Sequence, residues 1–151
     1  MDQRASRIQR RLTDALYVEA MVLADETRSY FDVIGREERE GLAAIDRVAF
    51  SCESLKVTTR LMHIIAWLLT QRAVDCGELT DRDALSPSRR LGEAPESDFS
   101  VVEMMPVQAA AIIHASIDLH RRVARLDQTL DEDLPVVSPA RTMFDRLAAA
   151  F

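Results

Sequence analysis

The sequence feature that most constrains the fold is an unbroken apolar heptad repeat between residues 45 and 76. Its apolar or small side chains recur at alternating steps of three and four residues. Such a pattern has a period of about 3.5 residues, which is typical of helices that pack side by side along their length. The members of this seam are Ile45, Val48, Cys52, Leu55, Thr59, Met62, Ala66, Leu69, Ala73 and Cys76.

The seam predicts one uninterrupted helix over residues 37–76. Gly77 is expected to end it, because glycine adopts a left-handed backbone at little cost. At about 1.5 Å per residue, such a helix is about 60 Å long. A helix of this length cannot fold back on itself, so other long helices must lie along it.

Two further patterns supply those helices. One covers residues 8–34 and ends at Gly35, a second expected stop. The other is a heptad seam over residues 102–130, in which Pro106 predicts a kink or a restart of the helix. Three such helices predict an all-α fold, an elongated antiparallel three-helix bundle with a long central helix, in a single domain over residues 1–151.

Two segments are less regular. Thr80 and Asp83 are placed to open a short helical turn after the long helix. Residues 85–99 are rich in Ser, Pro and charged side chains, and we expect a mobile loop there. Residues 131–151 begin with an acidic, proline-bearing linker and end in a short amphipathic tail.

Composition excludes several classes of protein. The net charge of −6 disfavours a general nucleic-acid binder, and 4 Gly with 5 Pro disfavour a many-turned all-β fold. The 2 cysteines are too few for a disulfide framework and suit a reducing cytosol. The most apolar run, residues 61–69, is shorter than the ~20 residues that span a bilayer, and no secretory signal is visible. We therefore expect a cytoplasmic protein.

The seam accounts for only one side of the predicted long helix. The opposite side also carries large apolar side chains, and burying a Leu or Ile contributes about 1.5–3 kcal/mol, so this back face tends to be covered. Either a second copy packs on it, or the other two helices cover both sides. The residues that a second copy would contact are Leu61, Ile64, Trp67 and Leu68.

The third helical pattern has a back stripe that passes from apolar to cationic. It consists of His114, Ile117, Arg121 and Arg125 at steps of three and four. One interpretation is the solvated end of a helix, where cations interact favourably with the helix dipole. The other is a docking patch for an acidic partner.

No catalytic, cofactor or metal site is predicted. His63, His114 and His120 have no spacing that brings metal ligands together, and Cys52 and Cys76 belong to the apolar seam. The sequence contains no glycine-rich phosphate loop and no GxSxG motif. We therefore expect a protein that is not an enzyme.

A resemblance to a known family is carried by residues 54–80, SLKVTTRLMHIIAWLLTQRAVDCGELT. This segment resembles the alphaproteobacterial helical proteins that include the regulator of CtrA degradation. Its matching core consists of TTRLM at 58–62, AWLL at 66–69, QRAV at 71–74 and GELT at 77–80, with flanking matches SYFD at 29–32 and RRVARLD at 121–127.

The resemblance implies a homodimeric three-helix bundle that helps to deliver regulatory proteins to the ClpXP protease. Such an adaptor acts by raising the local concentration of its cargo. On this hypothesis the docking surfaces for the protease machinery and its cargo include Arg60, Arg72, Arg121 and Arg125.

An alternative is a helical DNA-binding or transcription-associated regulator. Its only candidate recognition residues are Arg121, Arg122 and Arg125.

Overall fold

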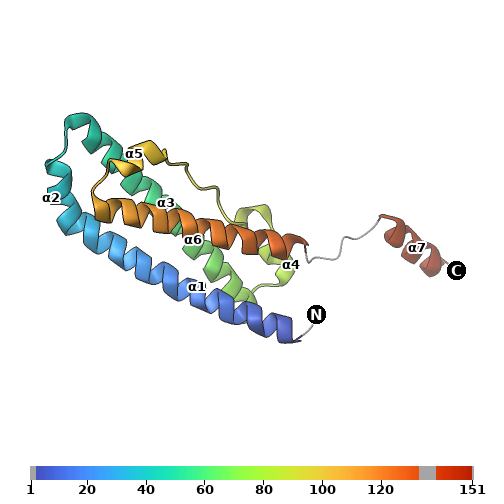
Figure 1. Cartoon of the computed structure of the whole chain (residues 1–151). Coiled ribbons are helices and arrows are strands. Elements are labelled where there is room, and N and C mark those ends of the chain that lie inside the picture. Colours follow the sequence, from blue (N-terminus) through green and yellow to red (C-terminus); the bar gives the residue numbers. More distant parts are fainter. Residues whose placement is uncertain (1–2, 133–138, 151) are drawn as a thin grey trace.

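The computed structural model describes residues 3–132 and 139–150, and over these ranges it is all-α (Figure 1). Three long helices, α1 (Gln3–Ser29), α3 (Ala44–Asp75) and α6 (Val107–Glu132), each pack against the other two. The predicted helical bundle with a long central helix is confirmed. None of the described helices is both long enough and apolar enough to cross a membrane.

The directions of the helices differ from a fully antiparallel bundle. Contacts between α1 and α3 join Arg10 to Asp75, so these two helices are antiparallel. Contacts between α3 and α6 join Arg60 to Ser116 and, further along both helices, Trp67 to Asp127. The helices α3 and α6 are therefore parallel, and the expectation of an antiparallel pair is wrong (Figure 1).

The first helix continues through the glycine expected to end it. A π-helical turn, η1 (Tyr30–Ile34), leads directly into α2 (Gly35–Glu40). Gly35 keeps a helical backbone, with φ −61° and ψ −31°. A Cβ atom at this position would lie 3.0 Å from the carbonyl oxygen of Tyr30 and 3.1 Å from its ring. Gly35 therefore permits close packing on Tyr30, and its prediction as a stop is wrong.

The predicted helix over residues 37–76 is interrupted near its start. Residues 41–43 separate α2 from α3, and Ala43 is extended with φ −62° and ψ 156°. This break reverses the chain so that α3 can return along α1. The 32 residues of α3 span about 48 Å.

The other end of α3 is as predicted. Gly77 adopts φ +78°, and its N–H donates to the carbonyl oxygen of Val74 at 3.0 Å. The N–H of Glu78 donates to the carbonyl oxygen of Ala73 at 2.9 Å, which completes a Schellman motif.

A run of short elements follows: α4 (Asp81–Ala84), η2 (Pro87–Arg89) and α5 (Phe99–Glu103). The predicted turn at Thr80 is confirmed, with a capping box between Thr80 and Asp83. Residues 90–98, which we call the strap, have no regular secondary structure. The strap carries the chain back along the bundle, and this return makes α6 parallel to α3 (Figure 1). The helix then restarts as α6 directly after Pro106.

The two apolar faces of α3 are placed opposite to expectation. The predicted dimer-interface residues lie in the core of the single chain: Leu61 is 5% exposed, Ile64 0%, Trp67 2% and Leu68 0%. They pack among buried residues of α1 and α6, so their assignment to an uncovered face is wrong. The seam predicted over residues 102–130 is buried at Val102 on α5 and, on α6, at Ala109, Ile112, Ser116, Leu119 and Val123.

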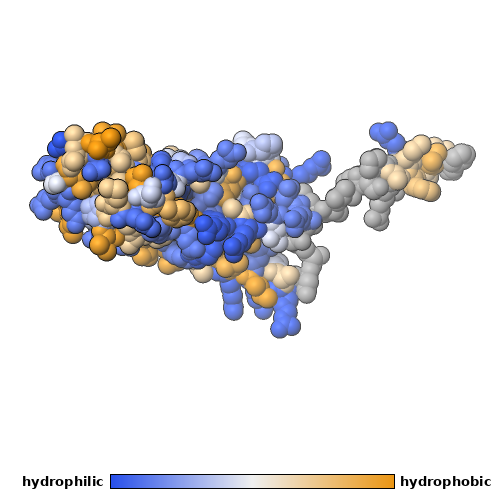
Figure 2. Space-filling view, turned by 45° about the horizontal axis from the view of Figure 1, so that its top comes forward, coloured by the Kyte–Doolittle hydropathy of each residue, from blue (hydrophilic) through white to orange (hydrophobic). Residues whose placement is uncertain are grey.

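The heptad seam of α3 faces outwards instead. Its large members are exposed, Ile45 at 79%, Val48 at 64%, Leu55 at 68%, Met62 at 63% and Leu69 at 48%. We call these five residues the outer stripe. Apolar surface is also visible at the bundle end that holds α2 and α5 (Figure 2).

The predicted amphipathic tail contains α7 (Pro139–Ala150). Its apolar side chains Met143, Phe144 and Leu147 are exposed. Residues 133–138, which include most of the predicted linker, and Phe151 lie outside the described residues.

This placement of the faces predicts unequal costs for two leucine truncations on α3. Leu68→Ala is expected to lower the free energy of unfolding by about 2–5 kcal/mol, because it opens a cavity in the core. Leu55→Ala is expected to change that of the single chain by less than about 0.5 kcal/mol, because Leu55 lies on the surface of the bundle. Both variants are compared at a protein concentration low enough to give monomers. Urea denaturation followed by circular dichroism measures both. Equal losses would contradict the assignment of the faces.

Candidate functional site

A pocket of about 530 Å³ lies where the strap crosses α3 and α6. We call it the strap pocket. Apolar side chains supply much of its wall, and polar groups converge on it from three elements. It is lined by Arg60, Ala94, Pro95, Glu96, Ser97, Phe99, Ile117, His120, Arg121 and Ala124.

Arg60 forms the buried polar base of this pocket. It comes from α3, is 1% exposed, and its Nη1 donates to Ser116 Oγ on α6 at 3.3 Å. Its Nη2 donates to the strap, to Pro95 O at 2.9 Å and to Ser97 Oγ at 2.6 Å. Burial lowers the pKa of the guanidinium, and the negative charge of Glu53 opposes that shift. Arg60 therefore joins α3, α6 and the strap and is not available as a surface docking residue.

A buried carboxylate completes this arrangement. Ser97 Oγ donates in turn to Glu53 Oε2 at 2.6 Å, and Glu53 is only 3% exposed. Lys56 Nζ lies 2.9 Å from the same carboxylate. A buried cation and a buried anion are thus linked through one strap hydroxyl, which agrees with the rule that buried charges are paired and hydrogen-bonded.

A second ionic contact holds the start of the strap. Arg90 contacts both carboxylate oxygens of Asp127, with Nε–Oδ1 at 2.9 Å and Nη2–Oδ2 at 3.1 Å. Trp67 Nε1 donates to the same carboxylate at 2.8 Å. Hydrogen bonding to Asp127 raises the pKa of Arg90. A bidentate pair of this kind fixes orientation as well as charge.

Two histidines bind the middle of the strap through its backbone. His63 Nδ1 lies 3.0 Å from Glu93 O, and His120 Nε2 lies 2.9 Å from Gly92 O. Carbonyl oxygens only accept, so each ring nitrogen donates. The spacing of these histidines in the sequence gave no indication of this contact with the strap. Among the described residues, no group of three or more His, Cys, Asp or Glu side chains is placed to hold a metal ion.

The mobility expected of residues 85–99 stays a prediction. In the structure, the polar contacts of Arg60, His63, His120 and Asp127 fix the strap to α3 and α6.

The four predicted docking arginines have different surroundings. Arg60 is buried, and Arg72 lies 4.4 Å from the centre of the Tyr17 ring and 3.9 Å from Asp14, so both hold the bundle together. Arg121 and Arg125 are exposed on α6, and in the part of the chain that is described their guanidinium groups have no partner. Arg121 lines the strap pocket, and Arg125 follows one turn later.

The aromatic side of the strap pocket was not predicted from the sequence. Phe99 is 56% exposed and stacks on His114, with ring centroids 5.8 Å apart and planes at 12°. Because Phe99 begins a short helix after an irregular segment, periodicity gave no signal for it. Arg122, a candidate in the DNA-binding alternative, pairs with Glu19 and Asp118 and is therefore occupied.

The close approach of the strap to α3 predicts a cost for a side chain at residue 92. In Gly92→Ala the new Cβ would lie 2.6 Å from His63 Nδ1, so the ring must turn and lose its bond to Glu93. We expect a loss of about 1–3 kcal/mol in the free energy of unfolding and faster amide exchange in residues 90–98. The matched control is the same substitution in a His63→Ala background, where the cost should fall. An undiminished cost there would contradict the steric explanation.

Comparisons with known proteins agree with the fold. Residues 4–151 match the family described as Protein of unknown function (DUF1465). The crystal structure of RcdA from Caulobacter crescentus CB15 is similar, with 32% sequence identity and a TM-score of 0.66, over 79% of this chain and 90% of that chain. No curated protein sequence matches the chain.

RcdA is a regulator of CtrA degradation, so the family resemblance inferred from residues 54–80 is confirmed. The chain belongs to the DUF1465 family.

Proposed function

We propose that this protein is a non-enzymatic, cytoplasmic adaptor that acts as a homodimer and helps to deliver regulatory proteins to the ClpXP protease. The observation that carries the proposal is the likeness to RcdA, at 32% identity over 90% of that chain. An adaptor needs surfaces that bind other proteins rather than a reaction centre, and the exposed groups of this bundle are of that kind.

The cargo-binding surface is the strap pocket together with the cations beside it. Arg121 and Arg125 offer forked donors for the carboxylates of an acidic partner. Phe99, exposed at 56%, offers an aromatic contact in the pocket that Arg121 also lines. Arginine and aromatic side chains are enriched at the residues that dominate protein–protein binding energy. The contacts of Arg60 and Asp127 hold this surface in shape before a partner arrives.

The dimer contact is the outer stripe of α3. From Ile45 to Leu69 the stripe extends about 36 Å along the helix. A heptad repeat of this length is complementary to another helix that lies along it. A second copy presents the same stripe, and a two-fold axis brings identical surfaces together. Burial of the stripe between copies would remove five large apolar side chains from water.

This model predicts that a charge on the outer stripe separates the copies without unfolding them. Met62→Glu and Leu55→Glu each place a charge in the apolar dimer contact, so we expect monomers in light scattering that keep the helical circular-dichroism spectrum and a cooperative unfolding transition. Gln128→Glu adds the same charge on an exposed position of α6 and should leave the mass unchanged. A wild-type protein that stays monomeric at high concentration, or variants that stay dimeric, would remove the stripe from the interface.

The adaptor role predicts faster cargo degradation in a reconstituted assay. With purified ClpXP and CtrA, addition of the wild-type protein should shorten the half-life of CtrA several-fold, because tethering raises its local concentration at the protease. The double variant Arg121→Glu/Arg125→Glu should lose this effect, since both free cations of the docking surface are reversed. Arg11→Glu, an exposed change on α1, is the charge control. The role would be refuted by half-lives that stay equal with and without the protein for CtrA and for other regulatory proteins.

A further inference from the structure

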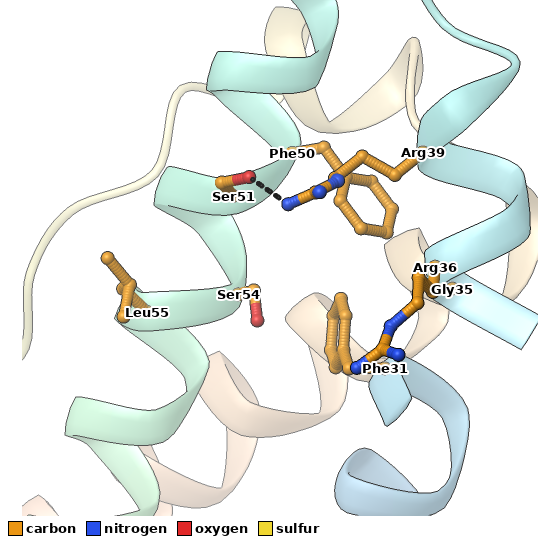
Figure 3. Close-up of a pocket in the computed structure, with 8 residues that line it drawn as sticks. All are labelled: Phe31, Gly35, Arg36, Arg39, Phe50, Ser51, Ser54 and Leu55. Atoms are coloured by element: carbon orange, nitrogen blue, oxygen red, sulfur yellow. Dashed lines mark hydrogen bonds between the residues drawn. The ribbon is translucent and has the colours of Figure 1, made fainter. Parts of the chain in front are cut away.

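A second pocket lies in the corner between α2 and α3 (Figure 3). These two helices meet at the end of the bundle away from the C-terminus of α3 (Figure 1). We call it the corner pocket. Its volume is about 390 Å³, and η1, α2 and α3 form its walls. The π-helical turn η1 is a form of helix that is frequent at functional sites. The lining residues are Phe31, Gly35, Arg36, Arg39, Phe50, Ser51, Ser54 and Leu55.

The floor of the corner pocket is aromatic. The rings of Phe31 and Phe50 meet edge to face, with centroids 5.5 Å apart and planes at 64°. Phe50 is 3% exposed and belongs to the core, which makes this floor rigid. Gly35 lets η1 pack closely, since a Cβ there would lie 3.0 Å from Tyr30 O. The floor therefore offers a preformed apolar surface to a ligand.

The rim of the corner pocket is cationic and rich in donors. Arg39 Nη1 donates to Ser51 Oγ at 3.3 Å, and Arg36 extends beside the Phe31 ring (Figure 3). Within residues 3–132 and 139–150, the Arg36 guanidinium and the Ser54 hydroxyl have no partner. No acidic side chain is among the lining residues.

The acidic residues of α2 do not neutralise this rim. Glu38 accepts a hydrogen bond from the Tyr30 hydroxyl, and burial together with that carboxylate raises the pKa of Tyr30. Glu37 and Glu40 are exposed and do not line the pocket. Asp32 is exposed and lines the neighbouring hollow, together with Arg28, rather than the corner pocket. The two arginines of the corner pocket therefore have no carboxylate among its lining residues.

The corner pocket continues into a groove between α1 and α3. Phe31 and Ser54 also line a neighbouring hollow of about 370 Å³, which reaches to Met62 and Ile65. Thr27 lies on this hollow, and its buried Oγ1 has no hydrogen-bond partner among the described residues. A free anion needs only the corner pocket. The groove gives room for the residues that flank an acidic side chain in a polypeptide.

We propose that the corner pocket binds a Glu or Asp side chain from an acidic segment of a partner protein, with an apolar neighbour of that residue on the Phe31 ring. The two guanidinium groups of α2 and the hydroxyls of Ser51 and Ser54 on α3 are donors that line the cavity from two facing helices, a set that suits a carboxylate (Figure 3). This inference rests on the adaptor function proposed above, because it assigns a partner-binding site to that adaptor. The site is separate from the strap pocket, with no lining residue in common.

The test is a titration of the full-length, ¹⁵N-labelled protein followed by NMR. The probes are the dipeptides N-acetyl-Phe-Glu-amide and N-acetyl-Phe-Gln-amide, which differ only in the charged group. We expect shifts at the amides of Gly35, Ser51 and Ser54, and binding of the Glu probe about tenfold tighter than that of the Gln probe.

Two variants identify the cations. Arg36→Gln and Arg39→Gln should each weaken binding of the Glu probe about fivefold or more, while keeping the thermal unfolding curve of the wild type. Arg47→Gln is the matched control, because Arg47 is an exposed arginine at the start of α3 outside the pocket.

Three results would overturn the inference. They are equal binding of the two dipeptides, binding that survives both pocket variants, and equal shifts from inorganic phosphate at the same concentration, which would assign the site to free anions. The titration contains no protease. If the Glu dipeptide binds more tightly than the Gln dipeptide but the protein does not change the half-life of cargo, the adaptor function alone is contradicted. If the protein shortens the half-life of cargo but the two dipeptides bind equally, the corner pocket alone is contradicted.

Discussion

The buried guanidinium of Arg60 is the interaction on which the rest of this structure depends. It lies between α3, α6 and the strap, and it is neutralised through Ser97 by the buried carboxylate of Glu53. A buried charge that loses its partners destabilises a protein by several kcal/mol, whereas a fully hydrogen-bonded one can specify a single arrangement. Only a chain that returns along the bundle brings Pro95 and Ser97 to Arg60. The network therefore requires the parallel course of α3 and α6.

The same network explains which face of α3 is buried. Both faces are apolar enough to form a core, but only one carries Arg60, Glu53 and Trp67 among its leucines. These polar groups find partners on the strap and on α6, at Ser97, Ser116 and Asp127. A rotation of α3 by half a turn about its own axis would bury the heptad seam and leave the large side chains of Trp67 and Leu68 exposed to water. The outer stripe is thus free for another molecule because the inner face is better satisfied within the chain.

The sequence predicted the elements well and their orientation poorly. Heptad spacing located α3 and α6, and local chemistry located the stop at Gly77 and the capping box at Thr80. Heptad spacing shows that a helix has an apolar face, but it does not show whether that face is buried within the chain or exposed. Composition identified residues 85–99 as irregular but not their path. An arginine on a helix is usually solvated, which hid the structural role of Arg60. The arginines of the corner pocket gave no signal, because Arg36 and Arg39 face Ser51 and Ser54 only once α3 has turned back.

That reversal at residues 41–43 also sets how the surfaces relate to one another. It lays α2 beside the first turns of α3, so the cations of α2 and the serines of α3 face a common cavity (Figure 3). The corner pocket borders the outer stripe at Leu55, and the strap pocket opens on other residues of α3 and α6. The helix α3 therefore contributes its inner face to the core and its outer stripe to the proposed dimer contact. It also contributes lining residues to both the corner pocket and the strap pocket. Because that helix is anchored by the buried hydrogen-bonded network of Arg60, Ser97 and Glu53, a partner bound at any of these surfaces meets a preformed scaffold, and binding does not have to order it first.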